Sequence, residues 1–220
     1  MPSFRRLLRD LPVLPADLPG WHVDDLTALP VDPRRLFEDW FTEAVDAGAR
    51  APHAMTLATS DGQGAVHART VILKDLTENG WWFAGHATSP KGRDLAADPR
   101  AALVFLWRET GCQVRVVGRA TDRPDVGELD FRDRPAPSRA SGLVGHQSEV
   151  LGTLAEHRAA WAAALEDTTA APDRVAPTWT AWVLEPDEVE FWRSGTGTGQ
   201  TRVRYLRRPD GAWARDLLWP

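Results

Sequence analysis

The sequence predicts an α+β protein in which helices flank an antiparallel sheet, built as a meander or small barrel. Three observations indicate this class. Five short strand-like runs with turn signals between them occupy residues 54–121. Apolar side chains recur at helical spacing before and after this block. Further strand-like runs follow at residues 178–217. With 220 residues, 43% of them hydrophobic, the chain can bury the core of one large domain or two small ones.

The amino-terminal third begins with an arm and a helix. Residues 1–30 are rich in proline and lack a sustained period, so we expect an irregular arm there, followed by a single domain over residues 31–220. Asp32 is typical of an N-cap and Pro33 of a first helical position. Leu36 and Phe37 then begin an apolar stripe at helical spacing, which predicts an amphipathic helix that ends near Gly48.

The central block alternates in the manner of strands. Strands are expected at residues 54–59, 65–76, 81–86, 101–107 and 113–121. Turns are expected at the glycine-containing segments 60–62, 78–80 and 109–111. Ser89 and Pro90 predict the cap and first position of a short helix through Ala97.

The remaining elements are a helical stretch and a second group of strands. The helical stretch covers about residues 125–164, with interruptions at Pro135 and Pro137. Strands are expected at residues 178–184, 188–193, 202–207 and 212–217. The glycine-rich segment 194–199 is followed by strand-like alternation and not by a helix, which argues against a dinucleotide-binding loop.

Composition excludes several classes of protein. The net charge of −5 and the lack of any polybasic run argue against nucleic-acid binding. Cys112 is the only cysteine, so no internal disulfide is possible, and a reducing cytoplasm is the expected location. The six histidines show no metal-ligand spacing, and we expect no metal. No apolar run suggests a membrane span or a signal core.

The two lysines stand out in this composition. The sequence has 24 arginines but only Lys74 and Lys91. A chain that uses arginine for nearly every cation is expected to keep lysine where a compact ammonium is needed. Both lysines are therefore candidate functional residues, although survival on a solvated surface would also explain them.

Polar residues on or beside the expected strands form a series of separated motifs. They are Arg69 and Lys74 around residues 70–73, the segment 89–93, Gln113 with Arg115, the segment 134–138, Gln147 with Ser148, and the segment 190–192 with Arg202. Their order and spacing resemble the pyridoxine/pyridoxamine 5′-phosphate oxidase family from about residue 30 to the end. The resemblance implies a Greek-key-like split β-barrel with flanking helices, and a homodimer that holds FMN in a cleft at the subunit interface.

The resemblance also implies site residues. Cofactor contacts would be Arg69, Thr70, Val71, Ile72, Lys74, Lys91, Gln113, Gln147, Ser148, Trp192 and Arg202. Substrate contacts would be Lys74, Asp130, Arg134, Ser138, Thr198 and Gln200, with Lys74 and Gln200 as the catalytic candidates. Arg69 and Lys91 match the cations for the FMN phosphate, whose desolvation is offset by charge-assisted hydrogen bonds.

The sequence departs from the family at the substrate end. Asp130 stands where the family has a tyrosine, and Thr198 and Gln200 stand where it has an Arg-x-His pair. An ionised carboxylate within about 4–6 Å of a substrate phosphate would oppose its binding. Loss of the arginine and histidine removes a cation and a group that titrates near neutrality.

The leading hypothesis is an FMN-dependent oxidase that transfers a hydride from a reduced aromatic substrate, with O2 as acceptor. Residues 107–110 and 91–93 also resemble the related phenazine-biosynthesis oxidases. The alternatives are an orthodox pyridoxine/pyridoxamine 5′-phosphate oxidase, a flavin-binding protein without turnover, and a deazaflavin-dependent relative.

Overall fold

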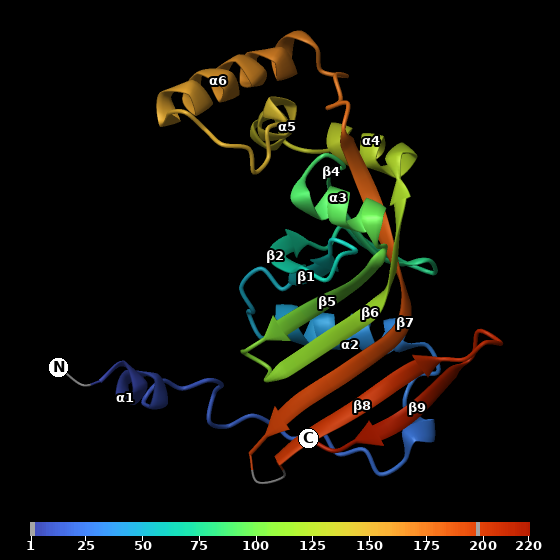
Figure 1. Ribbon diagram of the computed structural model, residues 1–220. Helices are drawn as coiled ribbons and strands as arrows, with labels where there is room; N and C mark the ends of the chain where they lie inside the picture. The colour runs from blue at the N-terminus through green and yellow to red at the C-terminus, as the bar shows by residue number, and fades with distance from the viewer. Residues whose placement is uncertain (1–2, 197–198) are drawn as a thin grey trace. The chain divides into compact units, whose positions relative to one another are not determined.

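A computed structural model describes residues 3–196 and 199–220 (Figure 1). The strands it describes are β1 (Ala54–Ser60), β2 (Val66–Ile72), β3 (Asp75–Thr77), β4 (Gly80–His86), β5 (Arg100–Trp107), β6 (Cys112–Arg123), β7 (Trp179–Gly195), β8 (Gly199–Arg207) and β9 (Trp213–Leu218). They form one sheet in the order β2-β1-β5-β6-β7-β4-β3, while β8 pairs with β7 and β9 pairs with β8.

The helices lie between these strands in the chain. They are α1 (Phe4–Arg9), the 3₁₀ turn η1 (Leu26–Ala28), α2 (Pro33–Asp46), α3 (Pro90–Ala97), α4 (Pro124–Arg132), α5 (Ala136–Val144) and α6 (Leu154–Ala170). The predicted α+β class is therefore confirmed. The expected irregular arm contains α1 and η1. Among the described residues, no helix has both the length and the apolar character needed to cross a membrane.

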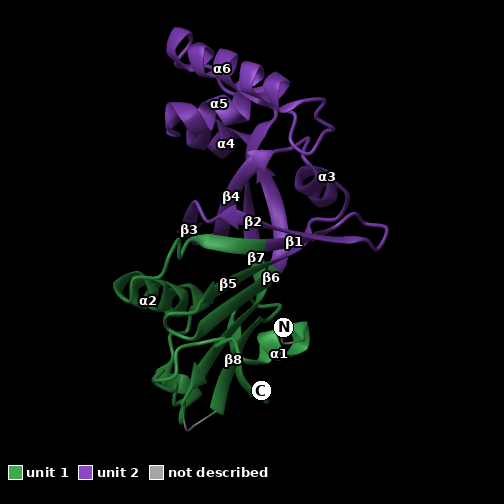
Figure 2. Cartoon of the chain, turned by 90° about the vertical axis from the view of Figure 1, so that its left-hand side faces the viewer, with its two compact units in different colours: residues 1–56, 103–117, 186–220 green, residues 57–102, 118–185 purple. Residues whose placement is uncertain are grey.

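The chain divides into two compact units (Figure 2). The first unit comprises residues 1–56, 103–117 and 186–220, and the second comprises residues 57–102 and 118–185. Four strands, β1, β5, β6 and β7, contribute residues to both units. Each unit has its own aromatic core.

In the first unit, α2 packs its apolar stripe on the sheet. The Asp32 side chain accepts a hydrogen bond from the Arg34 amide at 2.9 Å, so the predicted N-cap is confirmed. The rings of Phe37 and Phe105 lie edge to face with centroids 4.9 Å apart. Cys112 is fully buried in this unit, and burial raises the pKa of its thiol.

In the second unit, two glycines allow close packing. A Cβ on Gly80 would lie 2.1 Å from the Leu184 carbonyl oxygen, at the point where β4 pairs with β7. A Cβ on Gly127 would lie 2.5 Å from the Thr180 Cα. Because Gly127 has no side chain, α4 rests directly on β7, which fixes the position of Asp130 one turn further on.

The structure corrects three of the predicted boundaries. The strand expected at residues 65–76 is two strands, β2 and β3, separated at Leu73 and Lys74. The strands expected at 178–184 and 188–193 are one strand, β7. Pro186 does not end it, because pairing with β4 stops at Leu184 and pairing with β8 starts at Glu188. The long helical stretch also has a second break, at residues 145–153, that its prolines do not predict.

Candidate functional site

The second unit contains a cavity of about 630 Å³, which we call the main cavity. Strands β2 and β4, helices α3 and α5, and the segment after α5 supply its walls. Its predicted site residues are Thr70, Val71, Ile72, Lys74, Lys91, Arg134, Ser138 and Gln147. Other lining residues include Gly85, His86, His146, His157 and Trp179.

Helix α3 places Lys91 in this wall. The Ser89 side chain caps the helix by accepting a hydrogen bond from the Gly92 amide at 3.4 Å, and Pro90 opens it, as predicted. Lys91 is only 5% exposed. Its Nζ donates to Ser89 Oγ at 3.1 Å and to Gln147 Oε1 at 3.2 Å. The cap thus also orients the ammonium.

Lys91 is a buried cation with neutral partners. Across the described part of the chain, no carboxylate lies within ion-pair distance of its Nζ. Burial and then the nearby charge of Arg69 lower the pKa of Lys91 to about 8. A buried ammonium without a counter-ion is stabilised when an anion enters the cavity.

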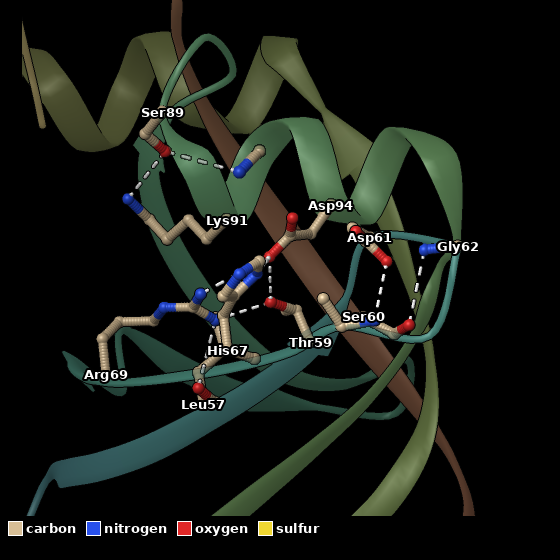
Figure 3. Close-up of polar contacts among 12 residues, drawn as sticks. Leu57, Thr59, Ser60, Asp61, Gly62, His67, Arg69, Ser89, Lys91 and Asp94 are labelled. Atoms are coloured by element: carbon tan, nitrogen blue, oxygen red, sulfur yellow. Dashed lines mark hydrogen bonds and ion pairs between the residues drawn. The ribbon is translucent and has the colours of Figure 1, made fainter. Parts of the chain in front are cut away.

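Arg69 approaches the same region from β2 (Figure 3). Its guanidinium donates to the Leu57 carbonyl at 3.2 Å and to Thr59 Oγ1 at 2.7 Å, and it lies 3.5 Å from Asp94 Oδ2. Asp94 also accepts hydrogen bonds from Thr59 Oγ1 at 2.6 Å and interacts with His67 Nδ1 at 3.0 Å. Asp94, which lies on α3, therefore fixes the position of the Arg69 guanidinium.

Asp94 is ionised in this cluster. Burial opposes its charged form, but the hydrogen bonds from Thr59 and His67 and the charge of Arg69 outweigh burial and lower its pKa. Arg69 itself does not line the main cavity; Lys91 does. The two predicted phosphate cations therefore differ, since Arg69 has an acidic partner and Lys91 has none among the residues described.

Gly85 on β4 leaves room for the Lys91 side chain. A Cβ at this position would lie 2.6 Å from Lys91 Cε and 2.8 Å from Nζ. The glycine therefore lets the ammonium cross the strand and reach the cavity wall.

At another part of the cavity, Lys74 pairs with a carboxylate. Lys74 Nζ lies 3.1 Å from Asp130 Oδ1, and Asp130 Oδ2 accepts a hydrogen bond from Trp179 Nε1 at 3.1 Å. The Arg134 guanidinium carbon lies 4.2 Å from the centre of the Trp179 ring. Arg134 donates to the Ser138 carbonyl at 3.2 Å, while its buried Nε has no hydrogen-bond partner within the described chain.

Three histidines also line the main cavity. They come from other parts of the chain than residues 194–201, the segment in which this sequence lacks the family's histidine. His86 is buried against Trp179 and interacts with Thr178 Oγ1 at 2.9 Å. Burial, followed by the charges of Lys91 and Arg134, lowers its pKa and so favours the neutral imidazole. His146 and His157 come from the segment after α5 and from α6.

Four further predicted residues, Gln113, Trp192, Gln200 and Arg202, lie in the first unit around a second cavity of about 520 Å³. It is lined by Val13, Leu14, Leu106, Arg108, Gln113, Trp192, Gln200 and Arg202. Trp192 Nε1 donates to Gln200 Oε1 at 3.0 Å, and the Arg202 guanidinium lies 3.1 Å from Glu190 Oε1. The arm joins this wall, because Arg108 donates to the Val13 carbonyl at 3.1 Å.

Three predicted residues that the structure describes lie in neither wall: Arg69, Ser148 and Asp130. Ser148 is exposed, follows Gln147 directly and has a positive φ of 70°. Asp130 reaches the main cavity only through Lys74. Thr198 lies outside the described residues. The predicted residues therefore fall into two groups, one in each unit.

Sequence reasoning missed Asp94, His86 and Trp179 as site residues. Asp94 carries one signal, since it lies one turn after Lys91 on the helix that Ser89 caps. Its partners Thr59 and His67 come from distant strands, which local spacing does not reveal. Arm residues Val13 and Leu14 carry no periodic signal.

Two family models match the chain. The pyridoxamine 5′-phosphate oxidase model matches residues 41–193, and the pyridoxine 5′-phosphate oxidase C-terminal dimerisation region matches residues 179–220. A pyridoxine/pyridoxamine 5′-phosphate oxidase of Nocardioides sp. is 40% identical over 201 residues, which cover 89% of this chain and 92% of the relative. Pyridoxine/pyridoxamine 5′-phosphate oxidase 1 of Ralstonia nicotianae is 38% identical over 191 residues, with coverage of 86% and 89%.

Solved structures give the same picture of the fold. PhzG from Burkholderia lata, in complex with tetrahydrophenazine-1-carboxylic acid, has a TM-score of 0.83 at 29% identity, and the match covers 92% of this chain and 99% of that one. A pyridoxamine 5′-phosphate oxidase-related, FMN-binding protein from Nostoc punctiforme has a TM-score of 0.72 at 17% identity, with coverage of 87% and 100%. At 17% identity the likeness concerns the fold alone. The predicted split β-barrel is confirmed.

Proposed function

The chain belongs to the pyridoxamine 5′-phosphate oxidase family, and we propose that it is an FMN-dependent oxidase of a reduced, nitrogen-containing aromatic substrate. The observation that carries this proposal is the buried Lys91 ammonium in the wall of the main cavity. It has neutral partners and a pKa of about 8, so a phosphate group would supply the missing counter-ion.

The residues around Lys91 fit an FMN phosphate. Ser89 is buried beside the ammonium and caps α3, and Arg69 adds a second positive charge nearby. Gly85 provides the space that the lysine side chain needs. Two cations with a hydroxyl suit a dianion that leaves water.

Other residues of the chain would hold the rest of the cofactor. Thr70, Val71 and Ile72 offer a strand wall for the ribityl chain and ring, and Gln147 and Ser148 would hydrogen-bond to FMN. Gln113, Trp192 and Arg202 are the contacts that we propose from the first unit. FMN, when bound, would accept a hydride from the substrate and pass electrons to O2, giving hydrogen peroxide.

The substrate end would be formed by Lys74, Arg134 and Ser138, with Asp130, Gln200 and Thr198 at the altered positions. A reduced tricyclic aromatic is favoured as substrate because PhzG, which shares the fold, was crystallised with tetrahydrophenazine-1-carboxylic acid. Lys74 and Gln200 are the proposed catalytic residues. Their amino and amide groups would orient the ring, while the neutral His86 is available near Lys91 and Arg134.

A homodimer is part of this proposal. The match of residues 179–220 to a dimerisation region supports it. We propose that FMN binds at the dimer interface.

The orthodox pyridoxine/pyridoxamine 5′-phosphate oxidase is the second candidate. Relatives at 40% and 38% identity carry that name, and Lys74, Arg134 and Ser138 are retained. A flavin-binding protein without turnover is a third candidate.

The first experiment is an absorbance spectrum of the purified protein before and after addition of FMN, with extraction and identification of any bound cofactor. Oxidation of pyridoxamine 5′-phosphate and of reduced phenazine carboxylates is then followed as peroxide release. A yellow protein that oxidises only the phenazine precursor supports the proposal, whereas efficient pyridoxamine 5′-phosphate turnover establishes the orthodox enzyme. Flavin that no substrate reduces indicates the binding protein, and failure to bind FMN contradicts both enzymes.

A further inference from the structure

Asp130 is held by two contacts at the proposed substrate end. Its Oδ1 pairs with Lys74 Nζ at 3.1 Å, and its Oδ2 accepts the Trp179 indole hydrogen at 3.1 Å. The carboxylate side chain is 16% exposed, less than half of the 34% of its lysine partner. The close packing of Gly127 on β7 holds the helix that carries it. Asp130 is therefore a built-in counter-ion of Lys74.

This pairing changes the charge that the main cavity presents to a ligand. Lys74 and Arg134 bring two positive charges to this end, and Asp130 removes one of them. Asp130 also acts on Arg134, because its charge partly offsets the lowering of the arginine pKa by burial. The net charge near +1 matches a monoanion better than a dianion.

The remaining cation, Arg134, can bind one acidic group. The Arg134 guanidinium lies over the Trp179 ring at 4.2 Å, and its buried Nε has no partner in the described chain. A guanidinium binds a carboxylate through two parallel hydrogen bonds. The Ser138 side chain lies in the same wall.

We propose that Asp130 is a specificity-determining residue, which makes this end of the cavity select an aromatic monocarboxylate over a phosphate monoester. Arg134 binds the carboxylate, and Asp130 keeps Lys74 from adding the second charge that a phosphate dianion needs. This inference rests on the proposed function, because that function assigns this end of the cavity to the substrate.

Binding of two probes to the purified full-length protein tests the proposal without turnover. Calorimetry at pH 8 compares phenazine-1-carboxylate with pyridoxine 5′-phosphate. The wild-type protein is expected to bind the carboxylate at least tenfold more tightly. Asp130→Asn keeps an oxygen acceptor for Trp179, and we expect it to bind the phosphate ester at least tenfold more tightly than wild type, a gain larger than that for the carboxylate.

Two further variants control this result. Asp125→Asn lies on the same helix, where Asp125 pairs with Arg123 at 3.0 Å outside the cavity, and it should leave both affinities within twofold. Adding Lys74→Met to Asp130→Asn should remove the gain for the phosphate ester, since the gain requires the released lysine. The proposal would be overturned if Asp130→Asn left the selectivity unchanged or if neither probe bound. It would also be overturned if the gain in affinity for the phosphate ester survived Lys74→Met.

Flavin content of the same preparations separates this proposal from the proposed function. A protein that takes up no FMN but shows the Asp130-dependent selectivity contradicts the oxidase and supports the selectivity. A yellow protein whose selectivity ignores Asp130 contradicts the selectivity alone.

Discussion

Lys91 and Lys74 line the same cavity, but their surroundings differ. Lys91 is buried, and its partners Ser89 and Gln147 are neutral. Lys74 is partly exposed, and its partner is the carboxylate of Asp130. The comparison teaches that the partners of a lysine side chain decide how much positive charge it offers to a ligand. The lysine without a described carboxylate partner fits a dianionic phosphate, whereas the paired lysine offers little charge to one.

The largest expected effect separates the two lysines. Lys91→Met should weaken FMN binding by roughly 100-fold, because a buried charge-assisted contact contributes about 2–3 kcal/mol. Lys74→Met is the matched control and should weaken it at least tenfold less. Quenching of FMN fluorescence on binding measures both, and equal losses would break the comparison.

The next largest effect is expected from a substitution of Gly85, which lies on β4 beside the Lys91 side chain. Gly85→Ala should displace the ammonium and weaken FMN binding by about tenfold, or roughly 1.4 kcal/mol, since the new Cβ would overlap Cε and Nζ. The fold should persist, because a flexible side-chain end can move.

Gly92→Ala is the contrasting variant. Its Cβ would lie 2.2 Å from the Ala87 carbonyl oxygen, which is backbone, so we expect a loss of about 1–3 kcal/mol in the free energy of unfolding. Urea titration distinguishes the two variants. A Gly85→Ala protein as unstable as Gly92→Ala would contradict a local role for Gly85.

The pH dependence of FMN binding sharpens the role of Lys91. The pKa of Lys91 is about 8, lowered by burial and by Arg69, so the ammonium loses its proton above pH 8. The dissociation constant should rise between pH 8 and 9.5, by up to tenfold per pH unit. Lys91→Met should remove this slope, and a slope that persists in the variant would assign it to another group.

The same shift has the opposite sign for the stability of the FMN-free protein. An unfolded lysine keeps its proton up to its ordinary pKa of 10.5, whereas folded Lys91 releases it near 8. The unfolded state therefore binds more protons between these values, and the contribution of Lys91 to stability rises with pH there.

The smallest effect concerns Asp94, the carboxylate that pairs with Arg69. Asp94→Asn should lower the free energy of unfolding at pH 7 by about 1 kcal/mol, because Arg69 loses its charged partner while an oxygen acceptor remains. The pKa of Asp94 is lowered, so its contribution is present above the ordinary value of 3.8 and disappears as the pH falls through its folded pKa. Denaturation at pH 7 and at successively lower pH below 3.8 should show a gap between wild type and variant that narrows as the pH falls.

Local sequence patterns predicted where helices and strands occur, but they predicted poorly where a strand breaks or continues. The caps Asp32-Pro33 and Ser89-Pro90 depend on neighbouring residues, and both helices begin as predicted. The gap predicted between residues 184 and 188 is wrong, because the effect of Pro186 depends on which strand lies beside it. The break at Lys74 is likewise invisible to residue alternation.

The candidate site shows the same limit. Family motifs drew attention to Lys91, Lys74 and Asp130, but not to their partners. The pair of Lys74 and Asp130 joins residues more than fifty positions apart, and it requires α4 to rest on β7 through Gly127. Such pairs follow from packing, which no local pattern encodes.

The burial of Cys112 has a consequence for an enzyme that makes hydrogen peroxide. Peroxide attacks thiolates, and the sequence has only this one thiol. Burial keeps the thiol protonated and out of solvent. Met55, the methionine that the structure describes, is 1% exposed. Under the proposed function, the hydrogen peroxide that the enzyme releases would therefore have little access to these sulfur atoms. This protection favours activity that persists over many turnovers.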